Sequence, residues 1–124
     1  MSDLEEKDIM NAILEMLTES WRLYHYTDDL VQRLVDVRMK KRGQNQIARF
    51  EKRMNAAMDK FQLELVDFAG QDYVTELPVR PINLDDFSGE DHLFIEVTLE
   101  PTIKKKKSAE IIHTGVVVVG RREE

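Results

Sequence analysis

Apolar residues in the first forty positions recur at the three- and four-residue spacing of a helix. The pattern runs from Leu4 to about Arg42, and Ile9, Ile13 and Met16 broaden its apolar stripe. A stripe this broad favours a helix bundle over a two-stranded coiled coil, because a bundle helix packs on more than one side. The central seam consists of Met10, Leu14, Leu17, Trp21 and Tyr24.

The phase of this pattern slips once, at Asp28, which occupies the next seam position. Thr27 could cap a new helix there, with acidic residues in the first turn. The pattern leaves open whether the helix is kinked or broken at this point. The run KKRG that ends at Gly43 predicts the end of the arm, because basic side chains complement a helix C-terminus and glycine adopts the left-handed cap conformation.

A second apolar row predicts a shorter helix of about seventeen residues after a tight turn. Its members are Ile47, Phe50, Met54, Met58 and Phe61. The two helices would form an antiparallel hairpin with one apolar flank uncovered. A second copy could cover that flank in a four-helix bundle, or the flank could pack on the chain's own C-terminal part. We expect a homodimer, with an interface at Ile13, Leu17, Trp21, Phe50, Met54 and Phe61.

From Leu63 the apolar period becomes two, which predicts strands. The residues from Ala69 to Asp72 supply a turn, and the prolines in LPVRPINL limit that stretch to an edge strand or a loop. The segments LFIEVTL, AEIIH and VVVV are the strongest strand candidates. We therefore predict an α+β chain, with a helical dimerisation arm at 1–62 and a small module of short β-strands at 63–124.

Charge changes this picture by making the middle of the chain strongly acidic. The protein has 124 residues, a net charge of −6 and no cysteine, and residues 63–103 hold ten acidic residues against one basic residue. Such a segment repels phosphate backbones, so we expect no nucleic-acid partner and favour a protein with a basic surface. The acidic N-terminus and the lack of a long apolar run predict a cytoplasmic protein without a membrane span, although the absence of cysteine is also compatible with the periplasm.

Candidate chemistry is sparse. The sequence has no cysteine nucleophile, no glycine-rich phosphate loop and no paired-histidine metal motif, which predicts that the protein is not an enzyme and has no cofactor. The acidic run at 85–92 lacks the regular spacing of a calcium loop, so we interpret it as a solvated loop without a metal. The tract of lysines at 104–107 is interpreted as a charged hairpin tip.

The junction between the two predicted parts resembles a known family. The run MDKFQLELVDFAGQDY is similar to the passage from helix into β domain in GrpE proteins, the nucleotide exchange factors of Hsp70 chaperones. Comparable places are held by Leu65, Asp67, Gly70, Gln71 and Tyr73. The chain departs from the family pattern after this turn, where LPVRPINL replaces a His-Glu-Ala segment, and before the last strand, where no Arg-Pro-Ala segment occurs.

The resemblance implies a co-chaperone that binds the nucleotide-binding domain of an Hsp70-type ATPase and promotes exchange of ADP for ATP. Such a factor binds the open, nucleotide-free conformation more tightly and thereby lowers nucleotide affinity. The expected contacts come from the turn and the acidic loop, which hold exposed aromatic residues beside charges. They are Gln71, Asp72, Tyr73, Asp85, Asp86 and Phe87. The alternative is a dimeric adaptor that binds a partner without affecting its nucleotide.

Overall fold

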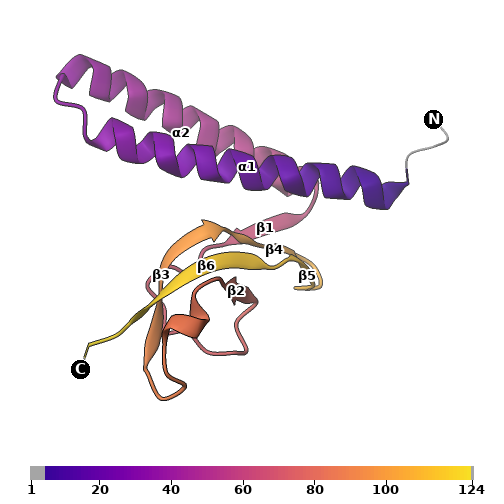
Figure 1. Cartoon of the computed structure of the whole chain (residues 1–124). Coiled ribbons are helices and arrows are strands. Elements are labelled where there is room, and N and C mark those ends of the chain that lie inside the picture. Colours follow the sequence, from indigo (N-terminus) through magenta and orange to yellow (C-terminus); the bar gives the residue numbers. More distant parts are fainter. Residues whose placement is uncertain (1–4, 124) are drawn as a thin grey trace. The chain divides into compact units, whose positions relative to one another are not determined.

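The structure is a computed structural model that describes residues 5–123. The chain divides into two compact units, Met1–Phe61 and Gln62–Glu124. The first unit is a pair of helices and the second contains six short strands in two small sheets (Figure 1). The predicted α+β class, with a helical hairpin before a small β module, is confirmed. Neither described helix combines the length and the apolar character needed to span a lipid bilayer.

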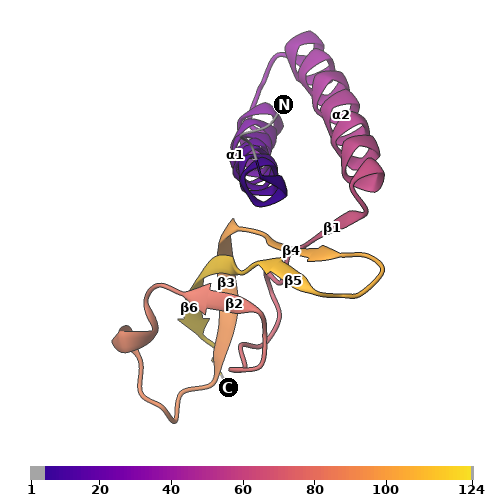
Figure 2. The ribbon, with the colours of Figure 1, turned by 90° about the vertical axis from the view of Figure 1, so that its right-hand side faces the viewer.

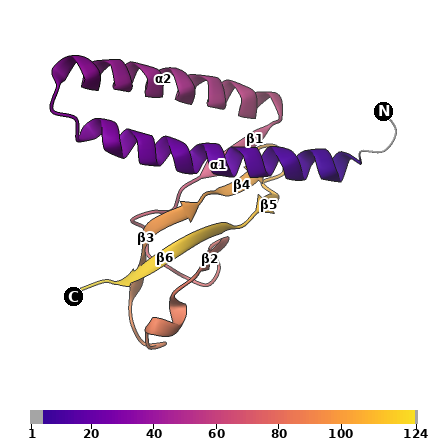
Figure 3. The ribbon, with the colours of Figure 1, turned by 45° about the horizontal axis from the view of Figure 1, so that its top comes forward.

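The helical unit consists of α1 (Glu6–Gln32) and α2 (Val37–Lys60), which lie antiparallel beside each other (Figures 1 and 3). A short turn at 33–36 joins them. Asp36 is the N-cap of α2, and its Oδ1 atom accepts a hydrogen bond from the backbone N–H of Met39 at 3.0 Å. This capping bond satisfies one of the unpaired donors at the start of a helix.

The structure answers the question left open at Asp28 and shows that the predicted end of the first helix and the role of KKRG were wrong. α1 continues through Thr27 and Asp28 without a break and ends at Gln32, ten residues before the predicted end at Arg42. The cap residue is Asp36 rather than Thr27, so the turn falls at 33–36. The run KKRG lies inside α2, where Gly43 is helical and caps nothing. Leu4, the predicted start of the first helix, lies outside the described residues.

The two helices approach each other closely at Gly43. A Cβ atom at that position would lie 2.8 Å from Val31 Cγ2, so the absence of a side chain lets the helices come together there. Further along the hairpin, the rings of Tyr24 and Phe50 stack with centroids 6.0 Å apart. The Tyr24 hydroxyl donates a hydrogen bond to Glu51 Oε2 at 2.5 Å. This bond, together with partial burial and the negative charge of Glu51, raises the pKa of Tyr24 to about 12.

The β unit is organised around one long antiparallel ribbon that runs through both sheets. β3 (Leu93–Glu100) pairs with β6 (Gly115–Arg121), and β4 (Thr102–Lys105) pairs with β5 (Ile111–His113). Pro101 separates β3 from β4, and it has no N–H to continue a ladder. The ribbon therefore changes sheets at this point, and its β4–β5 end is visible as a hairpin in Figure 2.

Two short strands complete the sheets at their edges. β1 (Leu63–Val66) pairs antiparallel with β4, and β2 (Val79–Pro81) pairs parallel with β6. The predicted strand at Leu63 is thus confirmed, and of the two alternatives left open for LPVRPINL, an edge strand or a loop, the structure has an edge strand at Val79–Pro81. β4 was not predicted, because its residues include two of the lysines assigned to a hairpin tip. Only Lys106 and Lys107 lie in that turn.

The crossing of the two sheets is held by a buried threonine. Thr102 Oγ1 donates a hydrogen bond to the carbonyl of Pro78 at 2.8 Å and accepts one from the N–H of Gly115 at 3.2 Å. A Cβ atom at position 115 would lie 2.7 Å from this hydroxyl oxygen, which explains glycine there. The core of the β3–β6 sheet lies beside this crossing and consists of Leu93, Ile95, Val117 and Val119.

The close approach at Gly43 predicts a coupling between Gly43 and Val31. Gly43→Ala should lower the free energy of unfolding by about 1 kcal/mol, because overpacking costs about 1–3 kcal/mol and the better helix propensity of alanine offsets about 1 kcal/mol. In a Val31→Ala background the same change should instead be stabilising by about 1 kcal/mol. Urea denaturation of the four proteins measures both effects.

Gly89→Ala is the control, because no atom lies within 4 Å of a Cβ at that position and its effect should be below about 0.5 kcal/mol. Equal effects of Gly43→Ala with and without Val31 would contradict the proposed packing.

Candidate partner-binding surface

The β unit contains a cleft of about 300 Å³ between the segment after β1 and the loop before β3. Both of the aromatic residues that the sequence assigned to partner binding, Tyr73 and Phe87, line this cleft. Each is half-buried and packs against the core of the β3–β6 sheet. The remaining lining residues are Val74, Thr75, Leu84, Ser88, Gly89, Asp91 and Leu93.

One wall of the cleft is held by backbone hydrogen bonds to the edge of β3. The N–H of Gly70 donates to the carbonyl of Ile95 at 2.7 Å, and the N–H of Tyr73 donates to that of Leu93 at 2.9 Å. The N–H of Ile95 donates to the carbonyl of Gln71 at 2.8 Å. Gly70 has a φ of +90°, a conformation that favours glycine and lets the chain turn onto the strand. These bonds fix the position of Tyr73.

The opposite wall is a single 3₁₀ turn, η1 (Leu84–Asp86), which is anchored to β6 by Asn83. The Asn83 side-chain amide donates to the carbonyl of Val119 and accepts from the N–H of Val119, both at 2.9 Å. The Asn83 side chain thereby makes the pair of hydrogen bonds that the backbone of a neighbouring strand would make to β6, the central strand of this sheet. Because Asn83 precedes η1 directly, this pair of bonds sets where Leu84 and Phe87 lie.

Acidic residues lie in the segment from Leu84 to Asp91, which supplies one wall of the cleft. Asp85 and Asp86 are exposed on η1, and neither forms an ion pair within the described residues. Asp91 faces Arg121, with Oδ1 3.7 Å from Nε, and its other oxygen accepts a hydrogen bond from the N–H of Ser88 at 2.9 Å. Asp85 and Asp86, which stand between the lining residues Leu84 and Phe87 in sequence, therefore remain available to a basic partner.

Asp72, a third predicted contact, is already engaged within the chain. Its Oδ1 lies 2.7 Å from Arg122 Nε, a close ion pair that is not aligned as a hydrogen bond, and its Oδ2 lies 3.6 Å from His92 Nε2. The Arg122 guanidinium also covers the ring of Phe94 and donates a hydrogen bond to the carbonyl of Gly70 at 3.1 Å. Asp72 and Gln71 lie along the β3 edge and do not line the cleft.

The structure thus brings together one residue from each of the two predicted contact segments, 71–73 and 85–87, which are separated by eleven residues in sequence. Two further exposed apolar residues of the cleft, Val74 and Leu84, were missed by the sequence analysis. Leu84 could have been found, because it stands three positions before Phe87, which is the spacing of one helical turn. Val74 could not have been identified from the sequence, since it belongs to no periodic row of apolar residues. No three His, Asp or Glu side chains gather as metal ligands within residues 5–123.

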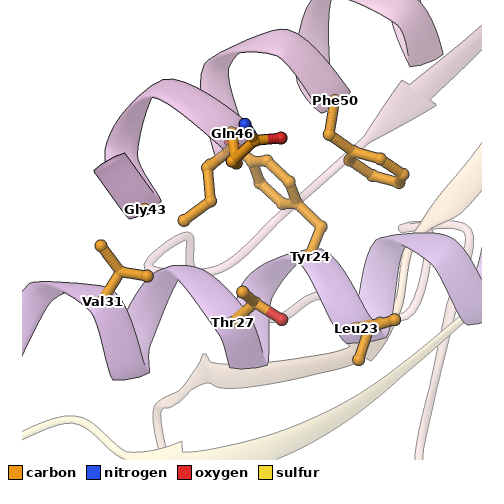
Figure 4. A pocket seen from close by; sticks show the side chains of 8 residues that line it. Leu23, Tyr24, Thr27, Val31, Gly43, Gln46 and Phe50 are labelled. Carbon is orange, nitrogen blue, oxygen red and sulfur yellow. The ribbon is translucent and has the colours of Figure 1, made fainter. Parts of the chain in front are cut away.

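In the helical unit, the six residues predicted for the dimer interface fall into two groups. Leu17 is buried, and Ile13, Trp21 and Met54 are half-buried. Phe50 and Phe61 are exposed. Figure 4 shows Tyr24 reaching from α1 toward α2 beside Phe50. Phe50 and Leu23 line an open apolar groove of about 310 Å³ between the helices.

Four exposed apolar residues of α1 that lie at a regular spacing were missed as interface candidates. They are Ile9, Met16, Leu23 and Leu30. Their spacing of seven was the available signal, since residues seven apart lie on one side of a helix.

Comparisons with models of protein families, with curated proteins and with solved structures find no match to this chain.

The anchoring of η1 gives a prediction for Asn83. Asn83→Ala would leave the buried N–H and carbonyl of Val119 without partners, so the free energy of unfolding should fall by roughly 1–3 kcal/mol. The amide proton of Val119 should also exchange faster with solvent than in the wild type. Asn45→Ala, on an exposed position of α2, is the matched control and should change stability by less than about 0.5 kcal/mol. An unchanged exchange rate at Val119 in Asn83→Ala would refute this role.

Proposed function

We propose that this protein is a non-enzymatic, homodimeric binding protein whose β unit holds another protein in the cleft at Tyr73 and Phe87. The observation that carries the proposal is the convergence of these two aromatic residues in one cleft. Next to Phe87 in sequence stand two exposed carboxylates, Asp85 and Asp86, that form no ion pair within residues 5–123. Aromatic anchors in a pocket supply much of the binding energy at protein interfaces, and a charged rim steers the partner and sets the association rate. The partner would present a basic surface with an apolar side chain at its centre.

The partner we propose is the nucleotide-binding domain of an Hsp70-type ATPase, with the protein acting as a GrpE-like exchange factor in the cytoplasm. This choice rests on the resemblance of the segment from Met58 to Tyr73 to GrpE proteins. The order of the elements agrees with it, since a helical hairpin precedes a β unit that ends in a valine-rich strand. Exchange would follow from tighter binding to the open form of the ATPase, and no covalent step is required.

An adaptor without exchange activity is the second candidate. It is favoured by a specific feature of the cleft. Leu84 is the last residue of the stretch LPVRPINL, where the sequence departs from the family pattern, and Phe87 follows three positions later. A cleft with one wall outside the family pattern could accept a different partner.

The release rate of a fluorescent ADP from Hsp70-type ATPases of the same cell tests the proposal. Acceleration that rises with the concentration of this protein is the expected result. Asp85→Lys/Asp86→Lys should reduce the association rate about tenfold at low salt, and the loss should shrink as salt screens the charges. Leu84→Ser should weaken binding without unfolding the protein, because Leu84 is exposed.

The control variant Glu6→Lys/Glu123→Lys has the same change of net charge at exposed positions outside the cleft and should retain activity. No acceleration by the folded protein would reject the exchange factor. Binding without acceleration would identify an adaptor. Full activity of both the Asp85→Lys/Asp86→Lys and the Leu84→Ser variants would show that the cleft is not the binding site.

A further inference from the structure

The hairpin carries an uncovered apolar surface on one side, which we call the apolar flank. On α1 the flank is a row of residues spaced seven apart. On α2 it is a row spaced eleven apart that ends at Phe61, the C-cap of this helix. Both spacings are close to a whole number of helical turns, so each row lies on one side of its helix. Leu23 and Phe50 line the same groove, which places both rows on the same side of the hairpin. The flank comprises Ile9, Met16, Leu23, Leu30, Met39, Phe50 and Phe61.

These side chains are unusually accessible for their size. Met16 and Leu23 retain 69% and 65% of their surface, and every other member of the flank retains at least 39%. α2 has no buried residue along its 24 positions, although it is strongly amphipathic. An exposed apolar surface of this extent marks an interaction site.

Charged residues border the flank with opposite signs on the two helices. On α1 the residue that follows each flank position faces α2, as Tyr24 and Val31 do. The residue that precedes each flank position therefore lies on the other side of the flank, away from α2. Those outer residues are Asp8, Glu15, Arg22 and Asp29. Arg22 is paired with Glu19 at 3.5 Å and Asp29 with Arg33 at 3.0 Å, which leaves two negative charges in this row.

On α2 the corresponding outer residues are all basic. Glu51 accepts the hydrogen bond from Tyr24, so position 51 faces α1 and position 49 faces away. The residues before the three flank positions of α2 are Arg38, Arg49 and Lys60. None of them forms an ion pair within the described part of the chain. The flank is thus bordered by a net negative row on α1 and a positive row on α2.

Two symmetric arrangements would bury the flank against a second copy. A twofold axis parallel to the helices places α1 of one copy over α2 of the other, and the acidic row then meets the basic row. A twofold axis across the helices places α1 over α1 and α2 over α2, so like charges meet. Exposed pairs contribute only about 0–1 kcal/mol each, but a like-charged row opposes the second arrangement along its whole length.

We propose that two copies pack face to face through the apolar flank, with α1 of each copy over α2 of the other. This rests on the homodimer included in the proposed function and specifies its geometry. The size is adequate: α1 has 27 residues and is about 40 Å long, so two helices present roughly 800 Å² per copy. A stable interface buries about 800 Å² per partner.

The geometry also fixes the register between the copies. Within one hairpin, Tyr24 faces Glu51 and Val31 faces Gly43, so the numbers of facing residues sum to 75 and 74. Rotation about an axis parallel to the helices leaves positions along the helices unchanged, and the same sums therefore apply between the copies. Met16 of one copy should therefore lie level with positions 58 and 59 of the other. Ala57, which stands seven residues after Phe50, is the position on the flank side next to that level and should face Met16.

Cysteine cross-linking tests this arrangement, because the chain has no cysteine of its own. Met16→Cys and Ala57→Cys are prepared as separate proteins, mixed and oxidised. The mixture should form far more covalent dimer than either variant alone. Ala48→Cys is the matched control: it is exposed on α2, on the side opposite to Phe50, and should not cross-link to Met16→Cys.

As a second readout, sedimentation equilibrium should show that the dissociation constant of the wild-type dimer rises several-fold with salt, because salt screens the attraction between the rows. Covalent dimer from Met16→Cys alone, or a dimer strengthened by salt, would overturn the pairing in favour of α1 over α1. A dimer without the Met16–Ala57 cross-link would overturn the pairing and leave the homodimer standing. A monomer at all concentrations would overturn both. Nucleotide release would still test the cleft independently.

Discussion

A 24-residue amphipathic helix that buries none of its residues sets the main physical constraint on this protein. Most of the stability of a helix in water comes from burying its apolar side against another element. α1 covers one side of α2 through the contacts at Val31, Tyr24 and Phe50, but the adjoining side of the hairpin remains exposed. The helical unit therefore resembles one half of a four-helix bundle, and the homodimer we propose would supply the other half.

The β unit has a buried core of its own. One long ribbon passes through both sheets, and Pro101 with Thr102 marks the point where it changes from one to the other. The core of the β3–β6 sheet then supports two segments that bring Tyr73 and Phe87 into one cleft. A rigid strand with short attached segments is a suitable base for a binding site, because the backbone bonds to β3 and β6 hold both walls in place.

The sequence was sufficient to predict the class of the fold and the change from helix to strand at Leu63, because period and propensity agree there. It was not sufficient to place the turn between the helices. Thr27 and Asp36 are both acceptable caps, and only the packing of Gly43 against Val31 requires KKRG to be helical. It also could not reveal that Asp72 is engaged by Arg122, fifty residues away, since ion pairs between distant segments have no local pattern. Tyr73 and Phe87 were identified as aromatic residues beside charged ones and, for Tyr73, from the family resemblance, but their common cleft required the fold.

The dependence of thermal unfolding on protein concentration tests most directly whether a second copy completes the hairpin. If the apolar flank is buried between two copies, the midpoint temperature should rise steadily as the protein concentration increases over a hundredfold range, because association stabilises only the folded chain. The high-concentration samples should sediment with twice the mass of the chain. A midpoint independent of concentration, with the mass of a single chain at every concentration, would contradict the account.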